Sequence, residues 1–334
     1  MAIDLPLIFS VVIAFSIFMY VLMDGFSLGV GILFRWAPSD EDRDTMMSST
    51  APIWDGNQTW LVLGGGGLLA AFPLAYSLIL PALYIPIIVM LIALIFRGVA
   101  FEFRFKAKTS RYLWDHAFHY GAIIATVSQG IVLGAFIQGI HVEGRRFAGG
   151  AFDWLTPFSF LVAMGLVFGY GLLGATWLVL KTEGDLQAWA YRISRRLLYG
   201  VVVLMGAISL ITPFLDDEIA ARWFSWPNIA YLSPVPLAVA AGGYALYRAI
   251  DRKQQLAPFL FAIGLFTLGY MGLGISLWPR LVPPDITIWE AAAAPESQSF
   301  LLIGVVVLIP VILGYTAYSY WVFRGKVKKD LGYH

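Results

Sequence analysis

Three ionisable side chains lie inside or at the edge of long apolar segments near the start of this chain. Asp24 lies in VLMDGFSLGVG (residues 21–31), Asp55 in PIWDGNQTW (52–60) and Arg97 in LIFRGVAFEFRFK (94–106). A charged group inside a membrane is costly unless it is partnered or hydrated, so such residues usually have a partner or a function. Carboxylates in this setting can exchange protons along water and amide groups, or form an ion pair with an arginine.

The spacing of these residues predicts their depth in a membrane. Asp24 precedes Arg35 by eleven residues, which corresponds to about 16 Å of helix, and Arg97 precedes Arg104 by seven, or about 10 Å. Asp55 lies about one turn into its segment. All three depths are measured from the same side, so the residues resemble a polar ladder towards the midplane. Both a buried Asp24–Arg97 pair that holds helices together and a hydrated proton path agree with this pattern.

Glycine and glutamine residues accompany these charges. Gly25, Gly29 and Gly31 flank Asp24, and residues 64–67 are four consecutive glycines. Small residues let helix backbones approach closely, so tight packing is favoured over a flexible gate. Gln129, in the middle of a later apolar segment, is predicted to form a hydrogen bond between helices.

The four histidines, His116, His119, His141 and His334, do not suggest a cofactor site. A haem with two histidine ligands needs imidazoles from facing positions at one depth. No two apolar segments here each offer a central histidine, so we predict that this chain ligates no haem or metal, and that His116 and His119 lie hydrogen-bonded or solvated at the interface. The absence of cysteine excludes disulfides, iron–sulfur ligation and covalent haem attachment. No motif marks a self-contained enzyme site.

The composition is typical of a membrane protein. Hydrophobic residues make up 59% of the 334 residues and charged residues 13%, with a mean hydropathy of +0.76. A soluble chain would be about a quarter charged. The net charge of +1 gives no indication of a nucleic-acid partner. The N-terminal segment lacks a basic region before its apolar run, so we expect a retained helix and not a cleaved signal peptide.

Nine apolar segments predict an all-α polytopic membrane protein, with residues 1–334 forming a single transmembrane domain. The predicted spans are 6–34, 52–73, 75–103, 117–140, 156–180, 197–214, 230–250, 257–278 and 299–323. Pro73 separates the second and third, which should form a tight helical hairpin. Pro234 and Pro236 disturb the start of the seventh.

Loop charges predict the orientation, because basic residues favour the cytoplasmic side. The tail FRGKVKKD is basic, and so are the loops after the third, fifth and seventh spans. Residues 215–223 and 283–297, on the opposite side, are net acidic. We therefore expect a cytoplasmic C-terminus and a periplasmic N-terminus.

The stretches DGFSLGVGIL, APIWDGNQTWLVLGGGGLLAAFP and FRGVAFEFRFK, in this order, closely resemble subunit II of cytochrome bd-type quinol oxidases. The resemblance is strongest over residues 20–106 and continues more loosely through all nine spans. WDGNQxW is its most specific motif.

The resemblance implies a subunit of a heterodimeric terminal oxidase in the bacterial inner membrane. Such an enzyme passes electrons from quinol to oxygen, forms water with cytoplasmic protons, and builds a proton motive force without pumping. Haems b558, b595 and d would be ligated by subunit I and none by this chain. The implied fold is two four-helix bundles plus one peripheral helix. A small single-helix accessory subunit, membrane lipid and, as in some relatives, a structural quinone are further possible partners.

Individual residues receive roles by position in these motifs. Asp55 matches a carboxylate near the subunit interface on a proton route. Asp24 matches the first acid of the family's DGFD element, whereas Ser27 replaces the second acid and cannot hold a proton. Glu102 and Arg104 match an acid and a base at the end of the third helix, either a cytoplasmic mouth or a helix-end clamp.

The neighbours of Asp55 are assigned supporting roles. Asn57 and Gln58, together with Thr59, would cap the helix or order water, and Trp54 and Trp60 would fix its depth.

Two other functions remain possible from the residues alone. A secondary transporter could use Asp24 and Arg97 as a substrate or ion site, but the matching broken helices of inverted repeats are absent from the sequence pattern. A self-contained b-type cytochrome is disfavoured by the histidine positions. Short loops, without a long insertion after the sixth span, are more similar to the cyanide-insensitive branch of the oxidases.

Overall fold

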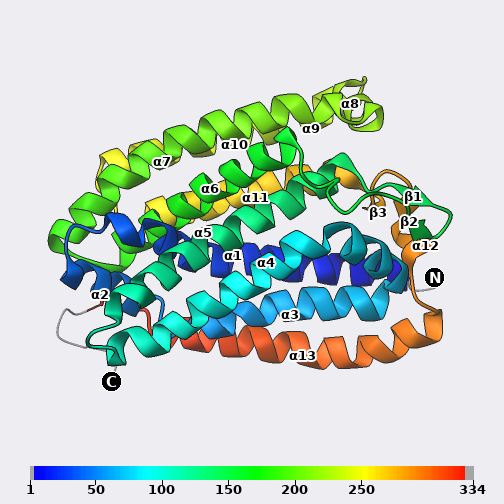
Figure 1. Ribbon diagram of the computed structural model, residues 1–334. Coiled ribbons are helices and arrows are strands. Elements are labelled where there is room, and N and C mark those ends of the chain that lie inside the picture. Colours follow the sequence, from blue (N-terminus) through cyan, green and yellow to red (C-terminus); the bar gives the residue numbers. More distant parts are fainter. Residues whose placement is uncertain (1–3, 328–334) are drawn as a thin grey trace.

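Long apolar helices lying side by side form nearly all of the structure, a computed structural model that describes residues 4–327 (Figure 1). Lys328, Lys329 and His334 lie outside the described residues. The helices are α1 (Leu5–Leu33), α2 (Asp40–Ser48), α3 (Trp54–Ala71), α4 (Pro73–Lys106), α5 (Arg111–Gln138), α6 (Pro157–Lys181), α7 (Gly184–Ile211), α8 (Asp217–Phe224), α9 (Asn228–Leu232), α10 (Pro234–Asp251), α11 (Ala257–Leu277), α12 (Ile288–Ala291) and α13 (Pro295–Val322). Two 3₁₀ turns, Phe34–Trp36 and Thr212–Phe214, follow α1 and α7.

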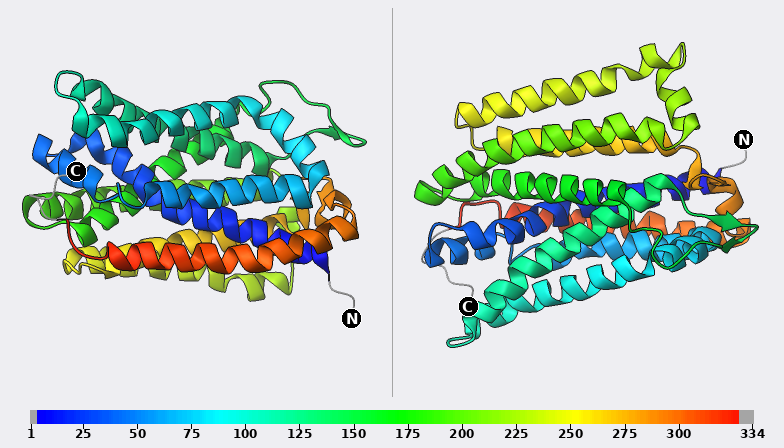
Figure 2. Two further views of the ribbon diagram at one scale, coloured as in Figure 1. Left: turned by 90° about the horizontal axis from the view of Figure 1, so that it is seen from below. Right: turned by 45° about the horizontal axis from the view of Figure 1, so that its top comes forward.

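Two antiparallel hairpins are the only strands in the described part of the chain. Strand β1 (Val142–Glu143) pairs with β2 (Arg146–Phe147), and β3 (Arg280–Val282) pairs with β4 (Ile286–Thr287). Both hairpins lie at the end of the helix bundle where α1 begins, together with α8 and α12, whereas α2 lies at the opposite end (Figures 1 and 2).

The prediction of an all-α polytopic membrane protein is confirmed. Within residues 4–327, eight helical segments are long and apolar enough to cross a membrane: α1, α4, α5, α6, α7, α9 with α10, α11 and α13. The predicted second span forms α3, whose polar first turns make it less apolar than the other eight. The count of nine spans therefore stays a prediction.

Some predicted boundaries were wrong because hydropathy detects only the apolar part of a helix. Helix α7 begins at Gly184 and not near residue 197, so Arg192, Arg195 and Arg196 lie on a helix and not in a loop. The acidic connection that follows α7 folds in part as the short helices α8 and α9. Helix α4 spans Pro73–Lys106 but is interrupted near Leu83, whose backbone is not helical.

Helix α1 is held at the centre by close backbone contacts. A Cβ atom at Gly29 would overlap the Tyr170 carbonyl oxygen, and one at Gly174 would overlap the backbone of Gly29, so α1 and α6 cross where neither can carry a side chain. Gly64 faces Ile17 of α1 at 3.3 Å from its Cβ position. Tight packing is thus confirmed for these glycines.

The middle two of the four consecutive glycines behave differently. Gly65 and Gly66 have no atom within 4 Å of their Cβ positions, whereas Gly67 again contacts α1. One face of α3 therefore packs inside the chain and another is left open.

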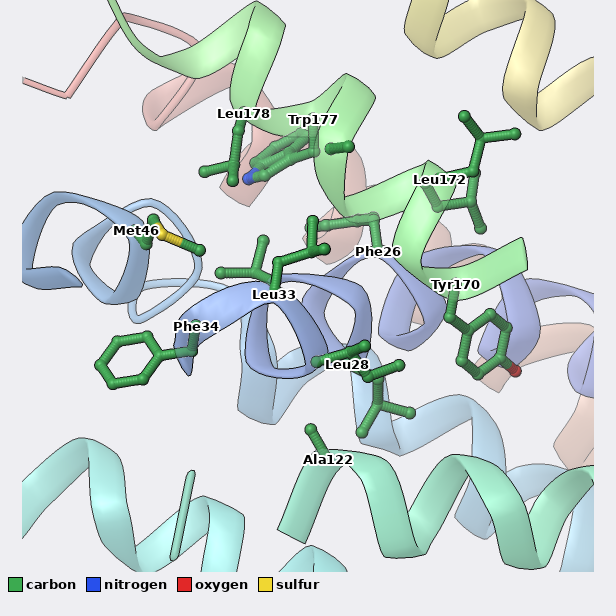
Figure 3. Packing of buried hydrophobic residues seen from close by; sticks show 14 of the residues in the cluster. Phe26, Leu28, Leu33, Phe34, Met46, Ala122, Tyr170, Leu172, Trp177 and Leu178 are labelled. Carbon is green, nitrogen blue, oxygen red and sulfur yellow. The ribbon is translucent and has the colours of Figure 1, made fainter. Parts of the chain in front are cut away.

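Aromatic and aliphatic side chains complete the core on the α2 side of the bundle. Phe26 of α1 stacks on Trp177 of α6 with ring centroids 4.2 Å apart, and Met46 of α2 is fully buried nearby (Figure 3). Leu28 and Tyr170 lie fully buried in the same cluster (Figure 3). This packing fixes the face of α1 that carries Asp24.

Candidate functional site

Asp24 of α1 and Arg97 of α4 form a fully buried ion pair. The Arg97 Nη1 atom donates to Asp24 Oδ2 at 2.9 Å and Nη2 donates to Oδ1 at 2.8 Å, and both side chains have 0% exposure. Two parallel charge-assisted bonds give strong, directional recognition. The two charges need this geometry, because desolvation in the interior opposes their attraction.

Ser27 is a further hydrogen-bond partner of the guanidinium. Its hydroxyl oxygen accepts a 2.8 Å hydrogen bond from Arg97 Nη2. Arg97 Nε has no hydrogen-bond partner among the described residues, and the Phe101 ring centroid lies 5.9 Å from the guanidinium carbon. Ser27, the residue that replaces the usual acid, therefore positions Arg97.

Gln129 links three helices beside this pair, as predicted. Its Nε2 donates to the Tyr20 hydroxyl at 2.8 Å, and its Oε1 accepts from the Tyr170 hydroxyl at 2.9 Å. No sequence signal singled out the two tyrosines, because the chain has 16 of them and their partners are distant in sequence.

Asn57 is a buried polar residue of the WDGNQTW motif. Its Nδ2 donates to the Met23 carbonyl of α1 at 2.8 Å, and its Oδ1 accepts from the Tyr320 hydroxyl of α13 at 3.0 Å. Asn57 was predicted to cap the helix or order water. In the structure it connects α3 to α1 and α13, and the carbonyl that it contacts on α1 belongs to Met23, the residue before Asp24.

Asp55 points the opposite way. It lies in the first turn of α3, is exposed, and has no hydrogen bond or ion pair within residues 4–327. Thr59, one turn further, is also exposed. No side-chain contact joins Asp55 to Asp24 or Arg97 in this part of the chain, so the three residues do not form a continuous ladder of direct contacts.

The remaining residues of the motif hold α3 in place. Trp54 stacks on Phe101 of α4 at 5.0 Å, and Trp60 is fully buried edge-on against Phe15 at 5.7 Å. Gln58 is half-buried, and its Nε2 has no hydrogen-bond partner among residues 4–327. A buried amide donor without a partner is costly, so this atom is an unusual feature of the motif.

Glu102 and Arg104, at the end of α4, differ in burial and in their partners. Glu102 is exposed and lies 3.5 Å from Lys106. Arg104 is buried and pairs with Asp115 of α5 and, at 2.6 Å, with Asp44 of α2. Of the two predicted roles, Arg104 therefore fits the helix-end clamp.

Asp44 and Asp115 were not singled out from the sequence. Arg111 also contacts Asp44, so α2, α4 and α5 meet in one ion network. The acidic run DEDRD at residues 40–44, together with the basic residues at the end of α4, is the sequence signal that could have revealed it.

The two neighbouring histidines lie on one helix, α5. His119 is buried with its Nδ1 hydrogen-bonded to the Gly31 carbonyl at 3.0 Å, and His116 is exposed. Within residues 4–327, no three His, Asp or Glu side chains are grouped so that they could hold a metal ion.

Comparisons with known proteins show which proteins this chain is similar to. The family model described as cytochrome bd terminal oxidase subunit II matches residues 5–323. Cytochrome bd-I ubiquinol oxidase subunit 2 of Escherichia coli K12 is 28% identical, covering 93% of this chain and 92% of its own length. Cytochrome bd ubiquinol oxidase subunit 2 of Bacillus subtilis is 29% identical, covering 92% of each.

A solved structure shares the fold. A chain of the bd oxidase from Geobacillus thermodenitrificans superposes with a TM-score of 0.77 at 17% identity, covering 96% of this chain and 99% of that one.

Proposed function

This chain belongs to the cytochrome bd terminal oxidase subunit II family, and from that premise we propose that it is the non-haem subunit of a bacterial quinol oxidase. Its function is to complete and stabilise a haem-bearing subunit I and to carry part of the proton supply for oxygen reduction. The observation that carries the subunit role is the family match over residues 5–323.

The described histidines do not fit axial ligation of a haem in this chain. His116 and His119 lie one turn apart on the single helix α5, so they cannot present imidazoles to the two opposite faces of one haem. Haems b558, b595 and d are therefore assigned to subunit I, where they supply the redox chemistry. No step of that chemistry is assigned to residues of this chain.

We assign α3 as the ninth span. It runs beside α1 and α13 and continues almost directly into α4, which agrees with a full crossing of the membrane (Figure 1). The nine spans would form one transmembrane domain over residues 1–334, as two four-helix bundles plus one peripheral helix. The basic residues near the ends of α4, α6 and α10 share the α2 end of the bundle, which supports a cytoplasmic C-terminus and a periplasmic N-terminus.

We assign the outward face of α3 as the contact with subunit I. This face carries Asp55, Thr59, Val62, Gly65 and Gly66, and residues 4–327 leave it uncovered. Small residues allow close approach of a partner helix. A carboxylate on such a face becomes buried between the subunits once they assemble.

Within this interface, Asp55 is assigned as the proton-carrying group. It is ionisable, exposed at the membrane surface that we assign as cytoplasmic, and one turn from the unpartnered Gln58 amide. Asp24 differs, because Arg97 donates hydrogen bonds to both of its oxygens and both side chains are fully buried. We therefore assign Asp24, with Ser27 and Arg97, to fixing α1 against α4 behind the proton route.

The transporter alternative is not favoured. A substrate or ion site needs a ligand position, whereas Asp24 and Arg97 satisfy each other at 0% exposure. Family membership also supports the oxidase.

Purification from the native membrane tests the subunit role. The tagged protein should copurify with a larger haem-bearing chain, show a b- and d-type reduced-minus-oxidised spectrum, and consume oxygen when quinol is added. Recovery of the folded chain without a haem-bearing partner would contradict the proposal.

A further inference from the structure

An apolar groove lies between α4 and α5 on the outer surface of the bundle. It has a volume of about 230 Å³ and is lined by Ile85, Pro86, Val89, Ile123, Ile124, Val127, Ser128, Ile131 and Trp154. Val89 and Ile124 are 40% and 43% exposed, so the groove opens towards the surrounding membrane. Its size is below the roughly 300–1,000 Å³ of pockets that enclose a whole small molecule, which suits one segment of a hydrocarbon chain.

Helix α4 is irregular next to the groove. Leu83 has non-helical backbone angles (φ −120°, ψ 17°), and Pro81 and Pro86 lie on either side of it. Proline removes a backbone hydrogen bond and crowds the preceding turn, which bends a helix. Pro86 itself lines the groove.

One end of the groove lies at a membrane surface. Trp154, which follows α5 in the connection to α6, closes that end, and its Nε1 donates to the Ala151 carbonyl at 2.8 Å. Phe152 and Leu155, beside it, are 64% and 51% exposed. Exposed aromatic residues around a tryptophan are typical of the boundary between hydrocarbon and headgroups. The groove thus runs from this boundary towards the middle of the membrane.

The same connection carries a basic hairpin. Arg145 and Arg146 are exposed at its turn and have no ion pair within residues 4–327. Two carboxylates lie near them. Glu143 is exposed opposite Arg146 across the hairpin, with its Oε1 3.7 Å from His141 Nε2, and Asp153 accepts the Gly150 N–H at 2.7 Å.

The hairpin and Trp154 share one apolar support. Val142 and Phe147 of the hairpin pack with Trp154 against the buried cluster that contains Phe72 and Leu83 of the α3–α4 region. The hairpin lies at the end of the bundle where α4 begins (Figures 1 and 2). The positive charges and the mouth of the groove are therefore at the same membrane surface.

We propose that this chain binds an anionic phospholipid, with one acyl chain in the α4–α5 groove and the phosphate at Arg145 and Arg146. Apolar surface recognises the chain, and two arginines supply the charge complementarity for a phosphate. This site is separate from Asp55 and Asp24, so the inference does not depend on the proton-route proposal.

The lining of the groove argues for a lipid chain and against a quinone ring. Among the lining residues, Ser128 and Trp154 alone have polar side-chain atoms, and the Trp154 indole N–H is already used. Quinone carbonyls need hydrogen-bond donors, and a neutral quinone gains nothing from two arginines. A phospholipid uses both the groove and the charges.

The binding can be tested in nanodiscs that contain the purified protein with its copurifying chains. A photoactivatable phosphatidylglycerol, with the reactive group in an acyl chain, serves as the probe, and photoactivatable phosphatidylcholine as the neutral comparison. Mass spectrometry of the peptides should show the phosphatidylglycerol probe on residues 85–89 and 123–131. Labelling by phosphatidylcholine should be much weaker.

Three variants separate the two halves of the site. Arg145→Gln/Arg146→Gln should lower groove labelling about 25-fold, at about fivefold for each arginine. Ile124→Trp, which fills the groove, should remove labelling there. Any background labelling of α13, which lies outside the groove, should stay unchanged. Arg192→Gln/Arg196→Gln, which removes two exposed charges from the other end of the bundle, should have no effect.

Equal groove labelling by the two probes would overturn the proposal, and so would unchanged labelling in Arg145→Gln/Arg146→Gln. A copurifying quinone that blocks labelling of residues 85–89 would also contradict it.

Discussion

Asp24 and Asp55 are both acidic residues near the start of the chain, but their surroundings differ, and we propose different roles for them. Arg97 and Ser27 enclose Asp24 in the interior, whereas Asp55 faces outwards from α3. Two charge-assisted hydrogen bonds to Arg97 hold the Asp24 carboxylate in one orientation in the interior. Asp55 makes no such contact within residues 4–327, which leaves its carboxylate open to the subunit contact that we propose.

Asp24→Asn should therefore act mainly on stability. It leaves the Arg97 charge buried without its counter-ion, at a cost of about 3–5 kcal/mol. We expect a lower yield of haem-containing complex and a lower melting temperature, measured on purified protein.

The double variant Asp24→Asn/Arg97→Gln provides the control. Because it removes both charges, it should recover part of the loss, and the difference gives the coupling energy of the pair. A single Asp24→Asn variant with normal yield and melting temperature would show that the pair does not support the fold.

At the scale of elements, the contact between α1 and α6 positions Asp24. Gly29 and Gly174 bring the two backbones together, and Tyr170 from the same turn of α6 reaches Gln129. A side chain at this crossing would separate the helices. The polar residues beside the crossing would then lose their partners.

Gly29→Ala tests this contact. The added methyl group would overlap the Tyr170 carbonyl, and overpacking of this kind costs about 1–3 kcal/mol or more. We expect a lower melting temperature of the purified complex. The matched variant Gly206→Ala, on α7 with no atom within 4 Å of its Cβ position, should be neutral or slightly stabilising. Equal melting temperatures for the two variants would contradict a tight crossing.

Much of the fold could be predicted at this scale, because helices that span a bilayer are recognised in a sequence by their long apolar runs. The interruption of α4 at Leu83 and the early start of α7 at Gly184 could not, since both depend on packing outside those runs. In the candidate site, two opposite charges within apolar segments predicted an Asp24–Arg97 pair as one of two alternatives. The contacts of Tyr20 and Tyr170 with Gln129, and of Tyr320 with Asn57, could not be predicted, because helical periodicity does not tell which of 16 tyrosines face an amide.

At the scale of the whole molecule, the two ends of the bundle differ in their net charge. Basic residues near α2 and acidic residues near α8 support one orientation in the membrane. The absence of cysteine from the sequence makes this orientation directly measurable by single-cysteine labelling.

Asp217→Cys and Lys108→Cys place a thiol at exposed positions on opposite ends. In intact spheroplasts, a membrane-impermeant maleimide should label Asp217→Cys, and it should label Lys108→Cys only after lysis. The reverse pattern would invert the orientation and place Asp55 on the wrong side for cytoplasmic protons.

The central claim, that Asp55 carries protons at the interface with subunit I, is tested most directly by the turnover of Asp55→Asn. The measurement is the quinol-dependent oxygen consumption of the purified complex, expressed per haem. Thr59→Val, on the same face of α3, is the matched control. We predict normal haem content with a rate at least about tenfold lower for Asp55→Asn, since positioned proton transfer contributes about 10²–10⁴-fold to catalysis, and a normal rate for Thr59→Val. Full assembly of Asp55→Asn with an unchanged rate per haem would contradict the claim.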